Sequence, residues 1–201
     1  MSHNSTAVFV DFENLRQGVF TKAYKEYKYY FDYNTQPQKV VDFCNLCVFD
    51  AFAEKDLHDL YRIFFYTAKP LAEHPSFDKI NLFLCSLEHS NHVALRLGKL
   101  VKRNGIVSQK QVDMLIGIDM AEISIKKFAD KIVLIGYDSD ISPALKLARC
   151  NGMQTEIILF EDLIPNIEPS LSKHCDNVKS VSVKDLYHKL NIIKANNLKN
   201  H

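Results

Sequence analysis

The stretch Ile132-Val133-Leu134-Ile135-Gly136-Tyr137-Asp138-Ser139-Asp140 decides the fold of this chain. A short β-branched run that ends at polar residues is typical of a buried parallel strand. Near the N-terminus, Ala7-Val8-Phe9-Val10 ends in the same way at Asp11. In an open α/β sheet, ligands bind just beyond the carboxyl ends of the strands. The two runs therefore predict acidic side chains at one edge of a sheet.

Strands and helices are expected to alternate along the chain, which predicts right-handed crossovers and an α/β fold. We expect a central, mostly parallel sheet of about five strands. The expected strands cover residues 7–11, 60–66, 92–97, 132–135 and 155–160, with a short strand or extended edge over 178–183. The expected helices cover 40–55, 77–89, 111–128, 142–151 and 184–192, and the polar stretch 102–110 holds a turn signal.

Composition limits the classes of protein to consider. The chain has 201 residues, so we expect one domain over residues 1–193 with a polar tail over 194–201. Its net charge is only +1, so no overall electrostatic field draws the protein to nucleic acid or to a membrane. No run approaches the roughly 18 apolar residues of a membrane helix, and no signal peptide is evident. An odd number of cysteines, five, favours a reducing cytoplasm.

Two cysteines have the spacing of a metal or redox motif, Cys44-Asn45-Leu46-Cys47. No second pair with this spacing follows, and the surroundings are apolar. The more favoured interpretation is two small core residues on successive turns of a helix. Zinc binding or redox chemistry is the alternative.

The acidic residues after the two strands indicate a metal site. The strands that end at Asp11 and before Asp138 and Asp140 can be neighbours at the switch point of a doubly wound sheet. Carboxylates brought together there repel one another, so we expect a divalent cation between them. The alternative is that Asp138 and Ser139 only cap the helix that follows.

The helix expected over 111–128 carries two more carboxylates. Asp119 follows Leu115 and Ile116 on the apolar side, where an unpaired carboxylate is costly, so it requires a metal or a cationic partner. Asp113 falls in the first turn, where the helix dipole accounts for it equally well.

Three polar residues are expected around the carboxylates. Asn14 comes one turn after Asp11, and its amide can hold a carboxylate or contact a phosphate. Lys110 can meet a phosphate or neutralise Asp113. Ser139 can cap the following helix and leave its free N–H groups near an anion.

Four motifs, taken in order, resemble the NYN domain family of the PIN-like nuclease superfamily, and most of all its LabA-like, DUF88-type members. The motifs are Asp11-Phe12-Glu13-Asn14, Lys110-Gln111-Val112-Asp113, Asp119 and Asp138-Ser139-Asp140. They match a D-x-x-N after the first strand, a K-x-V-D and a later D on a helix, and the D-S-D of S-G-D-S-D-F. The likeness covers about residues 6–160, which leaves 161–193 as a C-terminal extension.

The resemblance implies a Rossmann-like, three-layer PIN-like domain that acts as a ribonuclease. It implies that Asp11, Asp119, Asp138 and Asp140 are catalytic and bind Mg²⁺ or Mn²⁺, and that RNA, single-stranded or structured, is the substrate. It also implies that Asn14, Lys110 and Asp113 surround this site. In the expected mechanism, Asn14, Lys110 and Ser139 position the phosphate of the substrate. The chain departs from the family pattern at Gly136-Tyr137 and at Ile141. Tyr137 is bulkier than the usual glycine and is expected to narrow the cleft or change the turn.

Other functions are weighed against this one. A non-cleaving RNA-binding or protein-interaction module with the acidic pocket is the main alternative. A receiver domain or a haloacid-dehalogenase-like phosphatase is disfavoured, since the latter needs D-x-D-x-T. A dinucleotide-binding domain is disfavoured because no G-x-G-x-x-G follows a strand.

The segment Tyr24 to Tyr33 mixes lysine with tyrosine. It offers stacking faces and cations to single-stranded nucleic acid. The more favoured interpretation is that its aromatic side chains pack on the domain, or on a second copy of the chain in a homodimer.

Overall fold

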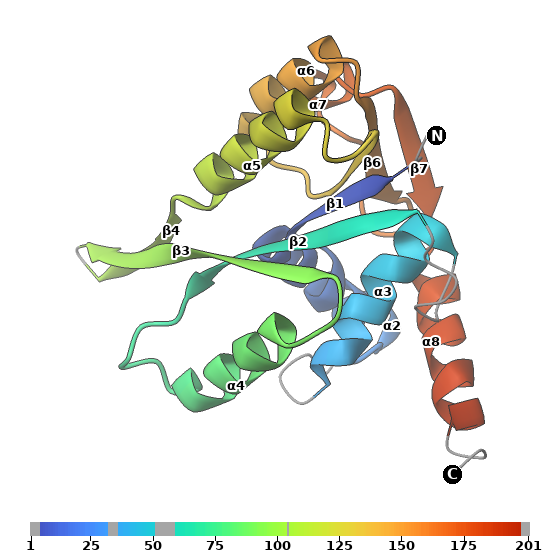
Figure 1. The fold of residues 1–201 in the computed structure, drawn as a ribbon. Helices are drawn as coiled ribbons and strands as arrows, with labels where there is room; N and C mark the ends of the chain where they lie inside the picture. Colours follow the sequence, from blue (N-terminus) through green and yellow to red (C-terminus); the bar gives the residue numbers. More distant parts are fainter. Residues whose placement is uncertain (1–4, 32–35, 51–58, 104, 198–201) are drawn as a thin grey trace.

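One sheet forms the centre of the molecule. The computed structural model describes residues 5–31, 36–50, 59–103 and 105–197. The sheet has seven strands in the order β4-β3-β2-β1-β5-β6-β7 (Figure 1). Neighbouring strands are parallel, except that β3 and β4 are antiparallel. The strands are β1 (Thr6–Asp11), β2 (Leu60–Lys69), β3 (Val93–Arg103), β4 (Ile106–Lys110), β5 (Lys131–Ile135), β6 (Gln154–Phe160) and β7 (Asn177–Val181).

The predicted α/β class is confirmed, but the predicted number of strands is too low. The polar stretch 102–110 forms the end of a hairpin, in which Leu100 pairs with Gln109 and Lys102 with Val107. This hairpin lies at an edge of the sheet, and Val107 is 48% exposed. An edge hairpin needs no apolar face, so its sequence lacks the pattern that reveals buried strands. The strand expected near 178–183 is present as β7.

Helices cover both faces of the sheet, which gives three layers (Figure 1). Helices α5 and α6 lie on one face, and α2, α3, α4 and α8 lie on the other. The expected helix 40–55 begins earlier, and its residues 51–55 lie outside the described residues; the last helix continues past 192. The helices are α1 (Phe12–Asn14), the π-helical η1 (Leu15–Phe20), α2 (Thr21–Tyr27), α3 (Pro37–Phe49), α4 (Phe77–Glu88), α5 (Val112–Lys126), the 3₁₀ turn η3 (Ser139–Ile141), α6 (Ser142–Cys150), α7 (Pro169–Ser172) and α8 (Val183–Asn197).

The alternation of side chains along β1 separates two hydrophobic cores. Val8 and Val10 pack on the side of α3 and α8, whereas Ala7 and Phe9 pack on the side of α5 and α6. Cys44 and Cys47 are buried in the first core, and burial raises the pKa of both thiols. They are therefore core residues, as the favoured interpretation of their spacing predicts. In the described part of the chain, no helix is long and apolar enough to span a membrane.

Most of the described aromatic segment packs on the domain. The ring of Phe31 stacks on Phe20 with centroids 4.3 Å apart, and Tyr29 stacks on Tyr187 of α8 at 4.2 Å. Tyr24 and Tyr30 are 53% and 62% exposed. The interpretation that these aromatic side chains pack on the domain is thus confirmed for Tyr29 and Phe31, while residues 32–33 lie outside the described residues.

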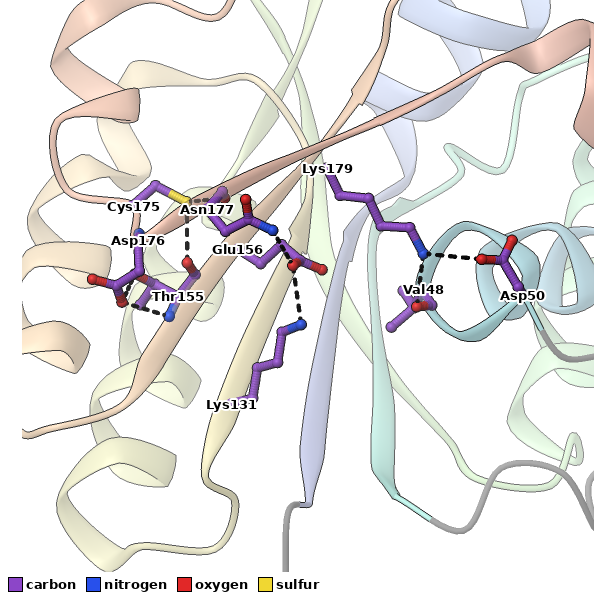
Figure 2. A network of polar contacts seen from close by, with 9 residues as sticks. All are labelled: Val48, Asp50, Lys131, Thr155, Glu156, Cys175, Asp176, Asn177 and Lys179. Carbon is purple, nitrogen blue, oxygen red and sulfur yellow. Dashed lines mark hydrogen bonds and ion pairs between the residues drawn. The ribbon is translucent and has the colours of Figure 1, made fainter.

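Polar contacts tie the strands together at their amino ends (Figure 2). Glu156 of β6 is buried, and its Oε2 is 3.0 Å from Nζ of Lys131 and accepts a 2.7 Å hydrogen bond from Asn177. Asp176 accepts hydrogen bonds from both the backbone and the hydroxyl of Thr155. These contacts join β5, β6 and β7 at their amino ends, whereas the predicted site lies at the carboxyl ends of the strands.

Candidate active site

The two predicted acidic segments meet because β1 and β5 are adjacent. Val10 pairs with Ile135, so Asp11 and Gly136 come next on neighbouring strands. A Cβ atom on Gly136 would lie 3.1 Å from the Cβ of Asp11, closer than ordinary packing. The predicted neighbourhood of the two strands is confirmed, and the glycine gives Asp11 its room.

Asp11 is a buried carboxylate held by Asn14. Its side chain caps α1: Oδ1 accepts from the Asn14 backbone N–H at 3.1 Å, and Oδ2 accepts from Nδ2 at 2.6 Å. Asp11 is 3% exposed. Burial raises its pKa to about 6, against the hydrogen bonds from Asn14, and the charges of Asp113 and Asp138 raise it further. The expectation that Asn14 holds a carboxylate is confirmed.

Asp113, in the first turn of α5, belongs to the same electrostatic group. Partial burial raises its pKa, and the negative charges of Asp138 and Asp140 add to this effect. The nearby ammonium group of Lys110 acts in the opposite direction. Four carboxylates from β1, α5 and the segment after β5 therefore interact electrostatically, with Lys110 beside them. We call them the coupled carboxylates: Asp11, Asp113, Asp138 and Asp140.

Asp138 caps the turn after β5. Its Oδ1 accepts a 2.9 Å hydrogen bond from the backbone N–H of Asp140. The expectation that Ser139 caps the helix is wrong: Asp138 is the cap of η3, and Ser139 is its first residue. Asp138 is the better acceptor because it sits one position earlier, in an extended backbone conformation.

Asp119 forms its hydrogen bonds on the side of α5 that faces β3. Its Oδ2 accepts 2.8 Å hydrogen bonds from the Tyr66 hydroxyl and from Nε of Arg96. The sequence predicts a metal or a cationic partner for Asp119, and the structure supplies a cationic one. Tyr66 and Arg96 are not predicted from the sequence, although the charged residue inside the apolar run of β3 is a signal that could have found Arg96.

Tyr137 turns away from the carboxylates. Its ring packs against the core on the α3 and α8 side, and its hydroxyl donates a 2.9 Å hydrogen bond to the carbonyl of Ile158. Asp11 follows the opposite alternation, on the side of Phe9. The side chain of Tyr137, at the position where the NYN pattern has glycine, thus lies in the core.

The donor set suits a hard divalent cation, because Mg²⁺ and Mn²⁺ prefer carboxylate oxygens. Within the described ranges, no three carboxylate, imidazole or thiol groups are already gathered closely enough to hold a metal ion. The observation that fits a cation is that neighbouring negative charges raise the pKa of both Asp11 and Asp113, in addition to the effect of burial. Bound positive charge would replace their repulsion.

A solved structure shares the fold. The crystal structure of a protein of unknown function from Vibrio parahaemolyticus RIMD 2210633 matches with a TM-score of 0.55 and 18% identity, over 91% of this chain and 96% of that one. A putative oxidoreductase from Parabacteroides merdae ATCC 43184 matches with a TM-score of only 0.36 and 7% identity, over 89% of this chain and 32% of that one. This second likeness supports no conclusion.

A family model identifies the chain more firmly. None of the curated proteins matches it. The model of the NYN domain matches residues 5–182, which include every strand of the sheet and all the coupled carboxylates. The LabA-like, DUF88-type subgroup stays a prediction. By this match, the chain belongs to the NYN domain family.

Proposed function

We propose that this protein is a metal-dependent ribonuclease that hydrolyses phosphodiester bonds at the carboxyl ends of β1 and β5. Membership of the NYN family makes a PIN-like nuclease the expected class. The observation that carries the proposal is the coupling of Asp11 with Asp113 and Asp138, three carboxylates from separate segments. Asp11 is buried beside two further negative charges, and carboxylates with pKa values perturbed in this way concentrate at functional sites. We propose RNA as the partner and the cytoplasm as the location; the homodimer stays a prediction.

The proposed cofactor is Mg²⁺ or Mn²⁺, held by Asp11, Asp138 and Asp140. Asp113 is the carboxylate of α5 that is coupled to this group, and Asp119 stays a predicted ligand. A divalent cation at these oxygens would supply an activated water and stabilise negative charge on the phosphate.

The protein's own side chains would orient the reaction. The two hydrogen bonds from Asn14 fix the rotamer of Asp11, so both carboxylate oxygens keep their direction. Lys110 ends β4 next to Asp113 and offers an ammonium group to a phosphate. We assign the Ser139 hydroxyl, in the turn capped by Asp138, a second contact to that phosphate.

The test is cleavage of single-stranded and structured RNA with Mg²⁺ or Mn²⁺ by wild type and Asp138→Asn. The asparagine keeps Oδ1 as an acceptor for Asp140, so η3 keeps its cap. Asp130→Asn is the matched control, because Asp130 accepts a hydrogen bond from the Ser5 backbone N–H at the amino ends of β1 and β5, far along the strands from the site. We expect loss of cleavage in Asp138→Asn alone. Equal cleavage by all three proteins would point to a contaminant and refute the assignment.

The pairing of Asp119 with Arg96 favours a second candidate function, a non-cleaving RNA-binding or protein-interaction module. A ligand position that already holds a guanidinium group has less need of a metal ion. Calorimetric titration with Mg²⁺ and Mn²⁺ separates the two. Binding that is lost in Asp138→Asn supports the nuclease, whereas no binding at millimolar metal supports the module.

A further inference from the structure

A cavity of about 790 Å³ opens beside the candidate active site. Phe12 and Glu13, which follow Asp11 in the chain, form one part of its wall. Thr67 forms another, and it follows Tyr66, the register partner of Asp11 on β2. The cavity therefore lies at the same carboxyl end of β1 and β2 as Asp11, on the face of the sheet that α4 covers. Its volume lies within the ~300–1,000 Å³ range of small-molecule pockets.

The inner wall of the cavity is apolar and partly aromatic. The rings of Phe12 and Phe83 lie with centroids 5.3 Å apart and tilted by 33°. Leu84 of α4 and Leu100 of β3 also line it, and Val107 of β4 closes it from the hairpin. An apolar surface with aromatic faces suits a flat aromatic group such as a nucleobase.

The polar residues of the cavity include hydrogen-bonding groups and cations. Glu13 is neutralised by Arg16, whose Nε and Nη2 donate hydrogen bonds of 3.0 and 2.6 Å. His74, Lys102 and Gln109 also line the cavity. The wall thus carries donors and acceptors that can meet the edge of a base. Of its two carboxylates, Glu13 is paired with Arg16, and Glu73 is exposed to solvent.

Three lysines lie side by side at the ends of neighbouring strands. Lys69 of β2 pairs with Lys99 of β3, and Lys99 pairs with Lys110 of β4. All three are exposed. Neighbouring strands are about 4.8 Å apart, so the row spans roughly 10 Å. This lysine row ends at Lys110, beside the coupled carboxylates, and complements the charge of a phosphate backbone.

We propose that the cavity holds an unpaired base of single-stranded RNA whose backbone follows the lysine row into the active site. This inference rests on the proposed function and adds a substrate class to it. A base inside a duplex is stacked and paired, so it would have to be flipped out, at a cost in free energy, before it could enter the cavity. The protein therefore selects single strands, loops or ends.

The test fills the cavity from an exposed position. Val107→Trp places an indole at the cavity from edge strand β4, and Gln109→Trp is an independent second variant from the same wall. Val178→Trp is the matched control, because Val178 is 38% exposed on β7, the opposite edge strand. Equal thermal midpoints verify that the variants fold.

Binding is measured in EDTA by fluorescence anisotropy, so that cleavage does not enter. The probes are a labelled single-stranded oligoadenylate, the same strand annealed to its complement, and an abasic strand of equal length. We expect both cavity variants to weaken oligoadenylate binding about tenfold, as loss of a stacked base does. The abasic strand should bind all four proteins equally, and the duplex more weakly than the single strand.

Three results would overturn the proposal. These are no binding of oligoadenylate by wild type, equal binding by the cavity variants and Val178→Trp, or adenosine monophosphate binding as tightly as the oligonucleotide, which would assign the cavity to a free nucleotide. Base-dependent binding without any cleavage would refute the nuclease and leave the cavity assignment standing. Metal-dependent cleavage with no effect of Val107→Trp or Gln109→Trp on binding would refute the cavity assignment and leave the nuclease standing.

Discussion

Nε of Arg96 on β3 donates a 2.8 Å hydrogen bond to Oδ2 of Asp119 on α5, and the same oxygen accepts the Tyr66 hydroxyl. Asp119 retains 14% of its side-chain exposure, so removal of Arg96 leaves a largely buried charge with one neutral partner. We expect Arg96→Met to lower the free energy of unfolding by about 1–3 kcal/mol. Urea unfolding measures this change.

The double variant Arg96→Met/Asp119→Asn is the control for that prediction. It removes the unpaired charge, so it should lose less stability than the sum of the two single variants. Strictly additive losses would mean that the two side chains do not interact in solution.

Asp11 makes stability depend on pH. Its pKa is raised from 3.8 to about 6, so between these values the folded protein keeps a proton that the unfolded chain loses. Ionised Asp11 therefore opposes folding fully above about pH 6 and not at all below about pH 4. Asp11→Asn should stabilise the metal-free protein at pH 8 by about 1–2 kcal/mol, less than the roughly 3 kcal/mol of a two-unit shift because an amide oxygen accepts more weakly from Asn14.

Thermal unfolding in EDTA from pH 4 to pH 8 checks this prediction. The difference between variant and wild type should vanish near pH 4. A constant difference across the range would mean that the Asp11 carboxylate is not perturbed. Added Mn²⁺ should stabilise wild type more than the variant, which reverses the order seen in EDTA.

Tyr137 should matter for stability but not for catalysis. Tyr137→Phe removes the hydrogen bond to the Ile158 carbonyl while the ring stays in the core. We expect a loss of about 1 kcal/mol in the free energy of unfolding. Cleavage of RNA should match wild type. A large change in cleavage with an unchanged stability would mean that the ring faces the substrate.

Two glycines should respond to alanine in opposite ways. A Cβ atom on Gly98 would lie 2.7 Å from the Lys110 carbonyl oxygen and 2.7 Å from Cγ2 of Val112. Gly98→Ala must therefore push the start of α5 away from β3. Gly117 lies within α5, where the new atom would be 3.8 Å from Ala144. We expect Gly98→Ala to cost about 1–3 kcal/mol and Gly117→Ala to gain up to about 1 kcal/mol, measured by urea unfolding.

The buried parts of the fold could be predicted from the sequence because burial leaves a pattern. The strands β1 and β5 are apolar runs that stop at aspartate, and their adjacency follows from the switch point of an α/β sheet. The end of the hairpin, over residues 102–110, leaves no such pattern. Strand β4 lies at the edge of the sheet, so charged and apolar side chains are tolerated alike there.

The candidate site likewise contains some contacts that the sequence predicts and others that it does not. The position of Asp11 beside the segment after β5 follows from topology, and Asn14 follows from local spacing. The partner of Asp119 does not, because it depends on how α5 is rotated over β3. Helical spacing places Asp119 on the apolar side but cannot choose between a metal and Arg96, which is distant in the chain and close in space.

The adjacency of β1 and β5 also sets when the site comes into existence. β1 can pair with β2 as soon as residues 6–69 have left the ribosome, but its other neighbour is β5. Long-range parallel pairing forms slowly, and domains fold as they emerge from the N-terminus. Until the chain has been synthesised through Asp140, it therefore has Asp11 but no site. If the proposed nuclease activity holds, the protein is unable to cut RNA while most of its own sheet is still being translated.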